Sequence, residues 1–250
     1  MIDTHCHIEI EDYKNIEQIL ENCKKNGIDK IIVSGYDLES SKEAVKLADK
    51  YDAIYATVGF LPEVLQKENS YDLNDLEILL QNKKVVGIGE IGLDYYWYKD
   101  NKEEQKKLFI SQIKLALKYN KPIVIHCREA IQDCYDVVKK YSNLKGTMHC
   151  YSGSVEMAKE FVKLGLYISV GGVSTFKNSK NIKEVINELD LEYILLETDS
   201  PYLTPEPYRG KRNYPYYVGI IAEKISKIKN IDLKTIEIIT TSNACKLFDF

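Results

Sequence analysis

The chain alternates between short β-branched runs and longer stretches in which apolar residues recur every three or four positions. That spacing is typical of amphipathic helices, for example at Ile16, Ile19, Leu20 and Cys23, and at Phe109, Ile113, Ala116 and Leu117. Eight runs have the length and composition of buried strands: residues 2–6, 30–34, 54–58, 85–90, 122–126, 146–149, 167–170 and 193–197. The alternation predicts parallel strands joined by helical crossovers.

Residues typical of helix ends support this reading. Asn26-Gly27 favours the end of the first helix, because glycine readily adopts the left-handed conformation found there. Ser154, Ser179 and Asp232 stand where a side-chain oxygen could accept a hydrogen bond from the first turn of a helix.

Two α/β architectures fit the alternation: a closed (β/α)8 TIM barrel and an open doubly wound sheet. The polar residues favour the barrel, because they follow several different strands, where parallel barrels carry their catalytic groups. A length of 250 residues with 44% hydrophobic side chains suits one such barrel. We therefore expect a single domain over residues 1–250.

Composition narrows the setting. The six cysteines include no Cys-x-x-Cys pair, so we expect reduced thiols rather than disulfides or a zinc ribbon. The sequence shows no cationic leader followed by an apolar segment and no apolar run of ~18 residues. We expect a cytoplasmic protein with no membrane association and no obligate protein partner.

Six residues of metal-ligand type stand at or just beyond the ends of predicted strands. His5 and His7 are spaced i, i+2, which places both side chains on one face of a strand. The remaining residues of this kind follow four other strands: Glu90, His126, His149 and Asp199. Such groups are costly to bury without partners, and in a barrel they would converge on one mouth.

Imidazoles mixed with carboxylates suit zinc, manganese, magnesium or a similar divalent cation, and six ligands suffice for two ions that share a bridge. The alternatives are a structural polar network and a single structural metal. Strand alternation predicts that Cys6, Cys127 and Cys150, each following a histidine, face the helix layer. The alternative is that one of them is a ligand.

Several segments together resemble the TatD family of metal-dependent deoxyribonucleases, and the resemblance runs almost from end to end. They are Asp3-Thr4-His5-Cys6-His7, Gly87-Ile88-Gly89-Glu90-Ile91-Gly92-Leu93-Asp94-Tyr95, Ile125-His126-Cys127-Arg128-Glu129, His149-Cys150-Tyr151-Ser152-Gly153, Ser169-Val170-Gly171-Gly172, Glu197-Thr198-Asp199-Ser200-Pro201-Tyr202-Leu203 and Pro207-Tyr208-Arg209-Gly210-Lys211-Arg212-Asn213.

The resemblance implies two divalent ions per chain and phosphodiester hydrolysis. One ion is expected at His5, His7, Glu90 and Asp199, and the second at Glu90, His126 and His149. Glu90 and Asp199 are the implied catalytic residues, with Glu90 as the bridge and Asp199 as the general base. We expect 3′–5′ exonuclease-like action on DNA, preferably on single-stranded or frayed ends.

Arginine is sparse, and its placement suggests phosphate binding. The three arginines among 34 basic residues lie within the segments just quoted, although the net charge is −4. The expected phosphate contacts are Arg128, Arg209, Lys211 and Arg212, and the expected base-stacking residues include Trp97 and Tyr151. The alternatives are a solvated basic loop and aromatic rings packed beneath it.

One departure from the family pattern concerns substrate binding. Gly-x-His-Pro usually follows the third strand, whereas this chain reads Gly59-Phe60-Leu61-Pro62. The missing histidine resembles a substrate-positioning group in the family, so Leu61 affects substrate contact more than metal binding. Two other functions remain open: hydrolysis of a small ester or cyclic amide, and a catalytically weak metal-binding protein.

Overall fold

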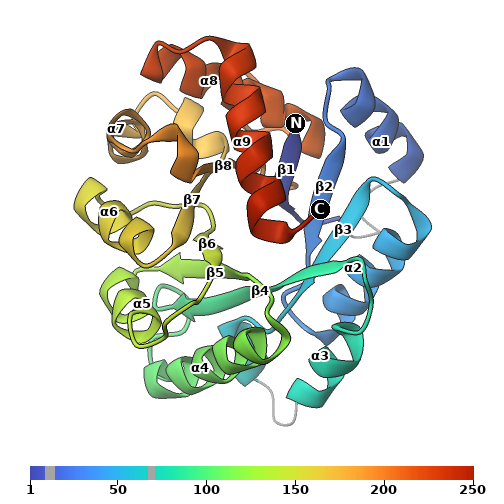
Figure 1. The fold of residues 1–250 in the computed structure, drawn as a ribbon, viewed down its shortest axis with the longest axis vertical. Helices are drawn as coiled ribbons and strands as arrows, with labels where there is room; N and C mark the ends of the chain where they lie inside the picture. The colour runs from blue at the N-terminus through green and yellow to red at the C-terminus, as the bar shows by residue number, and fades with distance from the viewer. Residues whose placement is uncertain (9–14, 67–70) are drawn as a thin grey trace.

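A computed structural model describes residues 1–8, 15–66 and 71–250 (Figure 1). Within these residues, eight parallel strands form one sheet in the order β1 to β8. They are β1 (Ile2–Cys6), β2 (Lys30–Ser34), β3 (Ile54–Val58), β4 (Val85–Asp94), β5 (Ile123–Arg128), β6 (Gly146–Met148), β7 (Leu166–Val170) and β8 (Ile194–Leu196). Consecutive order with every neighbour parallel confirms the (β/α)8 barrel and excludes the doubly wound sheet.

Most of the helices form an outer ring around the strands, whereas the last helix lies over one end of the barrel (Figure 1). The helices are α1 (Ile16–Lys25), α2 (Leu38–Lys50), α3 (Leu73–Leu79), α4 (Lys102–Tyr119), α5 (Ile131–Val138), α6 (Val155–Lys163), α7 (Lys180–Glu188), α8 (Val218–Lys229) and α9 (Leu233–Phe248). Short 3-10 turns lie at η1 (Pro62–Gln66), η2 (Gly172–Thr175), η3 (Leu191–Tyr193) and η4 (Pro215–Tyr217). None of the helices in the described residues is long and apolar enough to cross a membrane.

Side-chain and backbone hydrogen bonds join the last strand to the first. Thr4 Oγ1 donates to the carbonyl oxygen of Leu196 at 2.8 Å. Just beyond β8, the backbone N–H of Asp199 donates to the carbonyl oxygen of His5 at 3.0 Å. The seam of the barrel therefore lies beside the predicted metal ligands, and its bonds fix β1 relative to the segment after β8.

The amino ends of the strands are closed by α9. Apolar side chains there form a separate buried cluster made of Ile2, Ile32, Val86, Val124 and Leu195 from the strands and Ala244, Leu247 and Phe248 from α9. In β5, Val124 and His126 share one face because they are two residues apart. The face that is apolar at the closed end thus becomes polar at the open end.

Three local predictions need correction. β4 extends to Asp94 rather than ending at 90, because Gly92 and Asp94 continue the pairing with β5. Leu117 is 38% exposed and lies off the apolar face of α4. Ser179 occupies the N-cap position of α7 without capping it, because its hydroxyl donates to the carbonyl oxygen of Phe176.

The other end signals hold. Ser154 and Asp232 accept hydrogen bonds from the backbone N–H groups of Met157 and Thr235 and cap α6 and α9. Asn26 is the C-cap of α1, and Gly27 has a φ of +72°. Polar capping groups and glycine thus mark these helix ends as local chain chemistry dictates.

Gly92 should tolerate no side chain, because a Cβ built there lies 2.0 Å from the carbonyl oxygen of His126 and its φ is +148°. Gly92→Ala should lower the free energy of unfolding by about 3 kcal/mol or more, from the clash plus backbone strain. Gly27→Ala is the control, since its Cβ meets nothing within 4 Å, and strain alone costs about 1–2 kcal/mol. Denaturant unfolding gives both values, and equal losses would contradict the clash.

Candidate metal centre

Six ligand-type side chains meet at the carboxyl end of the barrel. His5 belongs to β1 and His7 lies just beyond it, Glu90 lies within β4, and His126 lies on β5. His149 follows β6 directly, and Asp199 lies three residues beyond the end of β8. The structure therefore brings together all six residues that the sequence predicts as ligands.

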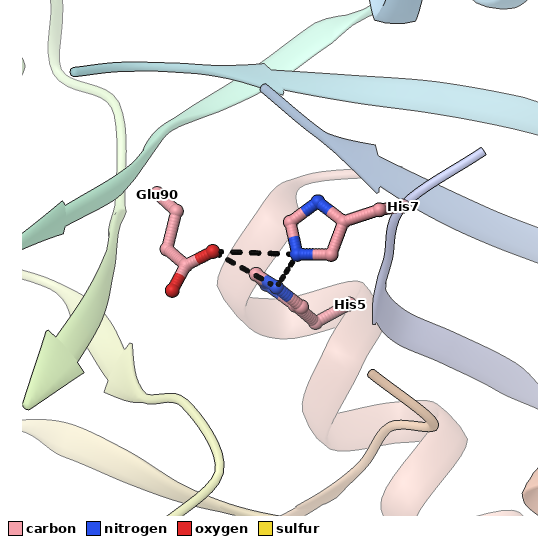
Figure 2. Close-up of side chains that lie close together, drawn as sticks. All are labelled: His5, His7 and Glu90. Atoms are coloured by element: carbon pink, nitrogen blue, oxygen red, sulfur yellow. Dashed lines mark hydrogen bonds and ion pairs between the residues drawn. The ribbon is translucent and has the colours of Figure 1, made fainter. Parts of the chain in front are cut away.

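Two histidines and Glu90 converge within one group of ligand atoms. His5 Nε2 lies 3.2 Å from His7 Nε2, and both nitrogens lie 3.4 Å from Glu90 Oε2 (Figure 2). Asp199 Oδ1 completes the group at 3.8 Å from His5 Nε2 and 3.6 Å from His7 Nε2. Ligands at 2.0–2.1 Å from a tetrahedral zinc ion lie about 3.3 Å from one another. The residues therefore fit a divalent cation.

The other carboxylate oxygen of Glu90 faces a second group of ligand atoms. Glu90 Oε1 lies 2.8 Å from His126 Nδ1 and 3.7 Å from His149 Nε2. Each oxygen of Glu90 thus faces a different pair of histidines. A carboxylate placed in this way has the geometry of a bridge between two ligand groups.

Every histidine of the centre has its outer ring nitrogen held by the barrel. His5 Nδ1 lies 3.0 Å from Ser34 Oγ, and His7 Nδ1 lies 2.9 Å from the carbonyl oxygen of Ser34. Because a carbonyl oxygen only accepts, His7 carries its proton on Nδ1 and directs the lone pair of Nε2 into the centre. This is the arrangement that a cation requires of a ligating imidazole.

Two carboxylates hold the outer ring nitrogens of the other two histidines, His126 and His149. Asp94 Oδ2 lies 3.1 Å from His126 Nε2, and Glu197 Oε2 lies 3.1 Å from His149 Nδ1. The sequence reasoning missed Ser34, Asp94 and Glu197. Glu197 had a usable signal, because it is a carboxylate immediately after β8 and two residues before Asp199.

Burial and opposing charges perturb the titration of these groups. Burial lowers the pKa of His5 to about 4, and nearby His149 adds to this effect. Burial also acts to lower the pKa of His126, but hydrogen bonds to Asp94 and Glu90 outweigh it and raise the value to about 9. The carboxylate of Glu197 and others likewise overcome burial at His149 and raise its pKa to about 10.

Asp199 differs from Glu90 in both its backbone and its titration. Its φ of +54° is left-handed, a conformation that aspartate tolerates better than most residues. Burial raises the pKa of its carboxyl to about 6 against the opposing effect of His149 and His7. The surrounding histidines instead hold the pKa of Glu90 well below its usual range despite its burial. The two carboxylates are therefore electrostatically distinct.

The cysteines follow the alternation rule at two of three positions. Cys6 is buried in the core and its thiol donates to the carbonyl oxygen of Ile32, and Cys127 packs against the same core. Cys150 is different, because its φ of +43° ends the strand alternation. Its thiol lies within 4.8 Å of ligand atoms of His149 and Glu197. The expectation that Cys150 faces the helix layer was wrong.

The residues predicted to contact substrate differ in their exposure to solvent. Arg128, Arg209 and Lys211 are exposed, and the guanidinium carbons of Arg128 and Arg209 each lie 4.2 Å from an aromatic ring centroid. In Arg212, by contrast, Nε and one terminal nitrogen are shielded from solvent. Tyr151 is only 5% exposed, and its hydroxyl donates to the carbonyl oxygen of Ser154. Little of its surface is open to a base in this structure, and its base-stacking role stays a prediction.

Leu61 lies close to the first ligand group. Its backbone N–H donates to the carbonyl oxygen of Tyr36, whose ring centroid is 5.6 Å from that of His7. A cavity of about 510 Å³ opens beside these residues and is lined by His7, Ser34, Tyr36, Asp37 and Lys46 among others. Leucine therefore replaces the family histidine near Tyr36, on the His7 side of the mouth.

A (β/α)8 barrel with histidines and carboxylates converging at the carboxyl end of its strands is the architecture of a metal-dependent hydrolase. The chain belongs to the TatD-related DNase family, whose model matches residues 2–249. It is 42% identical over 251 residues to a Bacillus subtilis (strain 168) protein named as the uncharacterized metal-dependent hydrolase YabD, with 99% of this chain and 98% of that one covered.

Solved structures agree with this assignment. The crystal structure of YJJV, a TatD homologue from Escherichia coli K12, superposes with a TM-score of 0.92 at 31% identity and covers 100% of this chain and 98% of its own. A TatD family hydrolase from Entamoeba histolytica gives a TM-score of 0.87 at 26% identity, with coverages of 99% and 97%. Fold and sequence thus lead to the same family.

Cation binding should release protons near neutral pH, because the pKa values of His126 and His149 lie at about 9 and 10 without a cation and a cation needs their free lone pairs. Zn²⁺ affinity should therefore rise from about pH 6 to about pH 9, by about tenfold per pH unit for each proton released, and level off above these pKa values.

Isothermal titration calorimetry in two buffers with different ionisation heats counts the protons. His126→Ala serves as the comparison and should lower the count by one. Zn²⁺ binding with no proton release at pH 7 would show that the histidines are already neutral and would contradict the raised pKa values of His126 and His149.

Proposed function

We propose that this protein is a deoxyribonuclease that hydrolyses DNA phosphodiesters with two divalent cations. The observation that carries the proposal is the placement of Glu90, whose Oε2 faces His5 and His7 while its Oε1 faces His126 and His149. Two cations sharing one carboxylate suit in-line displacement at phosphorus, where attacking and leaving oxygens both need stabilisation. Membership of the TatD-related DNase family supports the choice of substrate.

The protein's own groups have separate roles in this reaction. Cations at the two positions would polarise the phosphodiester and make a water molecule more acidic. Asp199 accepts the proton of the attacking water, because its carboxylate reaches the centre from β8 and its raised pKa of about 6 suits a general base. The Ser34, Asp94 and Glu197 contacts keep the four imidazoles oriented while charge develops.

Substrate is held by local positive charge, since the net charge of −4 gives no general attraction for DNA. Arg128, the last residue of β5, and Arg209, in the loop after β8, each have the guanidinium on an aromatic ring. Stacking leaves the edge of a guanidinium free for phosphate oxygens. Single-stranded or frayed DNA suits this mouth, because its bases can also reach exposed aromatic rings, and we expect 3′–5′ exonuclease-like action.

The two catalytic carboxylates should separate on substitution. Glu90→Gln should weaken the binding of both cations, because one carboxylate oxygen becomes an amide nitrogen that cannot ligate and the negative charge between the two positions is lost. Asp199→Asn should lower turnover of single-stranded DNA by about 10²–10⁴-fold while keeping most of the metal. Elemental analysis and cleavage of labelled oligonucleotides measure the two effects, and Glu192→Gln, at an exposed position before β8, is the matched control. Two ions retained in Glu90→Gln would refute the bridge.

The exposed guanidinium of Arg209 should contact phosphate. Arg209→Ala should weaken oligonucleotide binding and reduce the slope of log affinity against log salt by about 0.7, the value for one phosphate contact on a single strand. Metal content should stay unchanged. Lys234→Ala is the charge-matched control, because Lys234 lies with Met1 and Gly27 at the other end of the barrel. A slope equal to that of the unsubstituted protein would show that Arg209 makes no phosphate contact and that the loop is a solvated basic loop.

A further inference from the structure

Asp94 connects a ligand histidine to a turn of aromatic residues. Its Oδ2 lies 3.1 Å from His126 Nε2. Its Oδ1 accepts hydrogen bonds from the backbone N–H groups of Tyr96 at 3.0 Å and Trp97 at 2.9 Å. Both oxygens of one buried carboxylate are therefore engaged, one with each partner. The carboxylate that contacts His126 therefore also holds the turn.

The two ends of this turn, Asp94 and Tyr98, are held by the side chain of Gln105, which is fully buried on α4. Gln105 Oε1 accepts from the backbone N–H of Asp94 at 2.9 Å, and its Nε2 donates to the carbonyl oxygens of Asp94 at 3.1 Å and Tyr98 at 2.6 Å. Gln105 thus holds both ends of the segment, at Asp94 and Tyr98. Between these ends, the Asp94 carboxylate holds the backbone N–H groups of Tyr96 and Trp97.

The rings of Tyr96 and Trp97 are exposed to solvent and lie beside the guanidinium of Arg128. Trp97 is 64% exposed and Tyr96 41%, and their ring centroids lie 4.7 Å apart in an edge-to-face arrangement. The guanidinium carbon of Arg128 lies 4.2 Å from the Tyr96 ring centroid and 5.5 Å from that of Trp97. Arg128 stands two residues after His126 on β5. A planar ring attached to an anion, as in a nucleotide, matches this surface.

We infer that Tyr96 and Trp97 form a nucleobase-stacking subsite, and that Asp94 is a positioning residue that couples this subsite to cation binding at His126. The inference rests on the proposed DNA substrate. A cation bound by His126 would take the place of a ring proton and fix the ring, while Nε2–H continues to donate to Asp94. The turn is then held more firmly, and by linkage a stacked base favours the cation by the same factor.

Trp97 is the only tryptophan of the chain, so fluorescence excited at the red edge of tryptophan absorption, where tyrosine does not absorb, reports on this turn. Zn²⁺ titration of the metal-free protein should raise the fluorescence anisotropy of Trp97. In Asp94→Asn, Oδ1 still accepts from the turn but the amide cannot accept the His126 proton, so saturating Zn²⁺ should leave the anisotropy unchanged. Asp133→Asn is the control, because Asp133 bonds to Tyr95 and Lys106 instead. No change in the unsubstituted protein, or an undiminished change in Asp94→Asn, overturns the coupling.

Stacking is tested with oligonucleotides whose phosphorothioate linkages resist cleavage. An oligothymidylate should quench Trp97 in the Zn²⁺-loaded protein, whereas an abasic strand of equal length should not. Trp97→Ala should weaken binding of the labelled oligothymidylate on the order of tenfold, while Tyr193→Ala, an exposed residue before β8, should not. Equal quenching by the abasic strand overturns the subsite.

The two proposals fail differently. Quenching by oligothymidylate without cleavage of the unmodified strand would support the stacking subsite and overturn deoxyribonuclease activity. Cleavage of the unmodified strand without quenching by its phosphorothioate analogue would leave the activity standing and overturn the subsite.

Discussion

The buried charge of Glu90 governs the arrangement of the whole barrel mouth. A carboxylate that is 3% exposed is costly inside a protein unless positive groups and hydrogen bonds surround it. The four histidines supply that environment, and each then needs a partner for its outer nitrogen, which Ser34, Asp94 and Glu197 provide. In the cation-free protein, protons on His126 and His149 balance the carboxylates. In a metal-dependent hydrolase, cations take the place of those protons.

The seam of the barrel fixes the remaining ligand. Asp3 is fully buried, and its carboxylate accepts hydrogen bonds from the backbone N–H of Thr198 at 2.9 Å and from Thr198 Oγ1 at 2.5 Å. The buried amide of Asn213 donates to the carbonyl oxygens of Thr198 at 2.7 Å and Tyr202 at 2.6 Å. Asp199 is thus held between β1 and the basic loop. The hydrogen bonds that close the barrel between β1 and the segment after β8 therefore also position Asp199, the proposed general base.

The fold and the convergence of the six candidate ligands could be predicted from sequence, because strand periodicity and the parallel order of the strands bring these residues to one mouth. Strand alternation places His5 and His7 on one face, and the ends of parallel strands meet at one mouth. Ser34 and Asp94 could not be assigned in this way, since their roles depend on which ring nitrogen lies beside them after folding. The alternation rule also fails at Cys150, where a left-handed backbone breaks the strand.

Positively charged side chains lie near the barrel mouth although the net charge of the chain is −4. Of 34 basic residues 31 are lysines, yet the exposed cations that lie on aromatic rings beside the site include two of the three arginines, Arg128 and Arg209. A guanidinium can stack on a ring and still bind phosphate through its edge, whereas an ammonium group cannot do both. Leu61 adds no charge on the His7 side. The proposed phosphate contacts therefore lie at the end of β5 and in the loop after β8, which suits a ligand held by local groups rather than by the overall field.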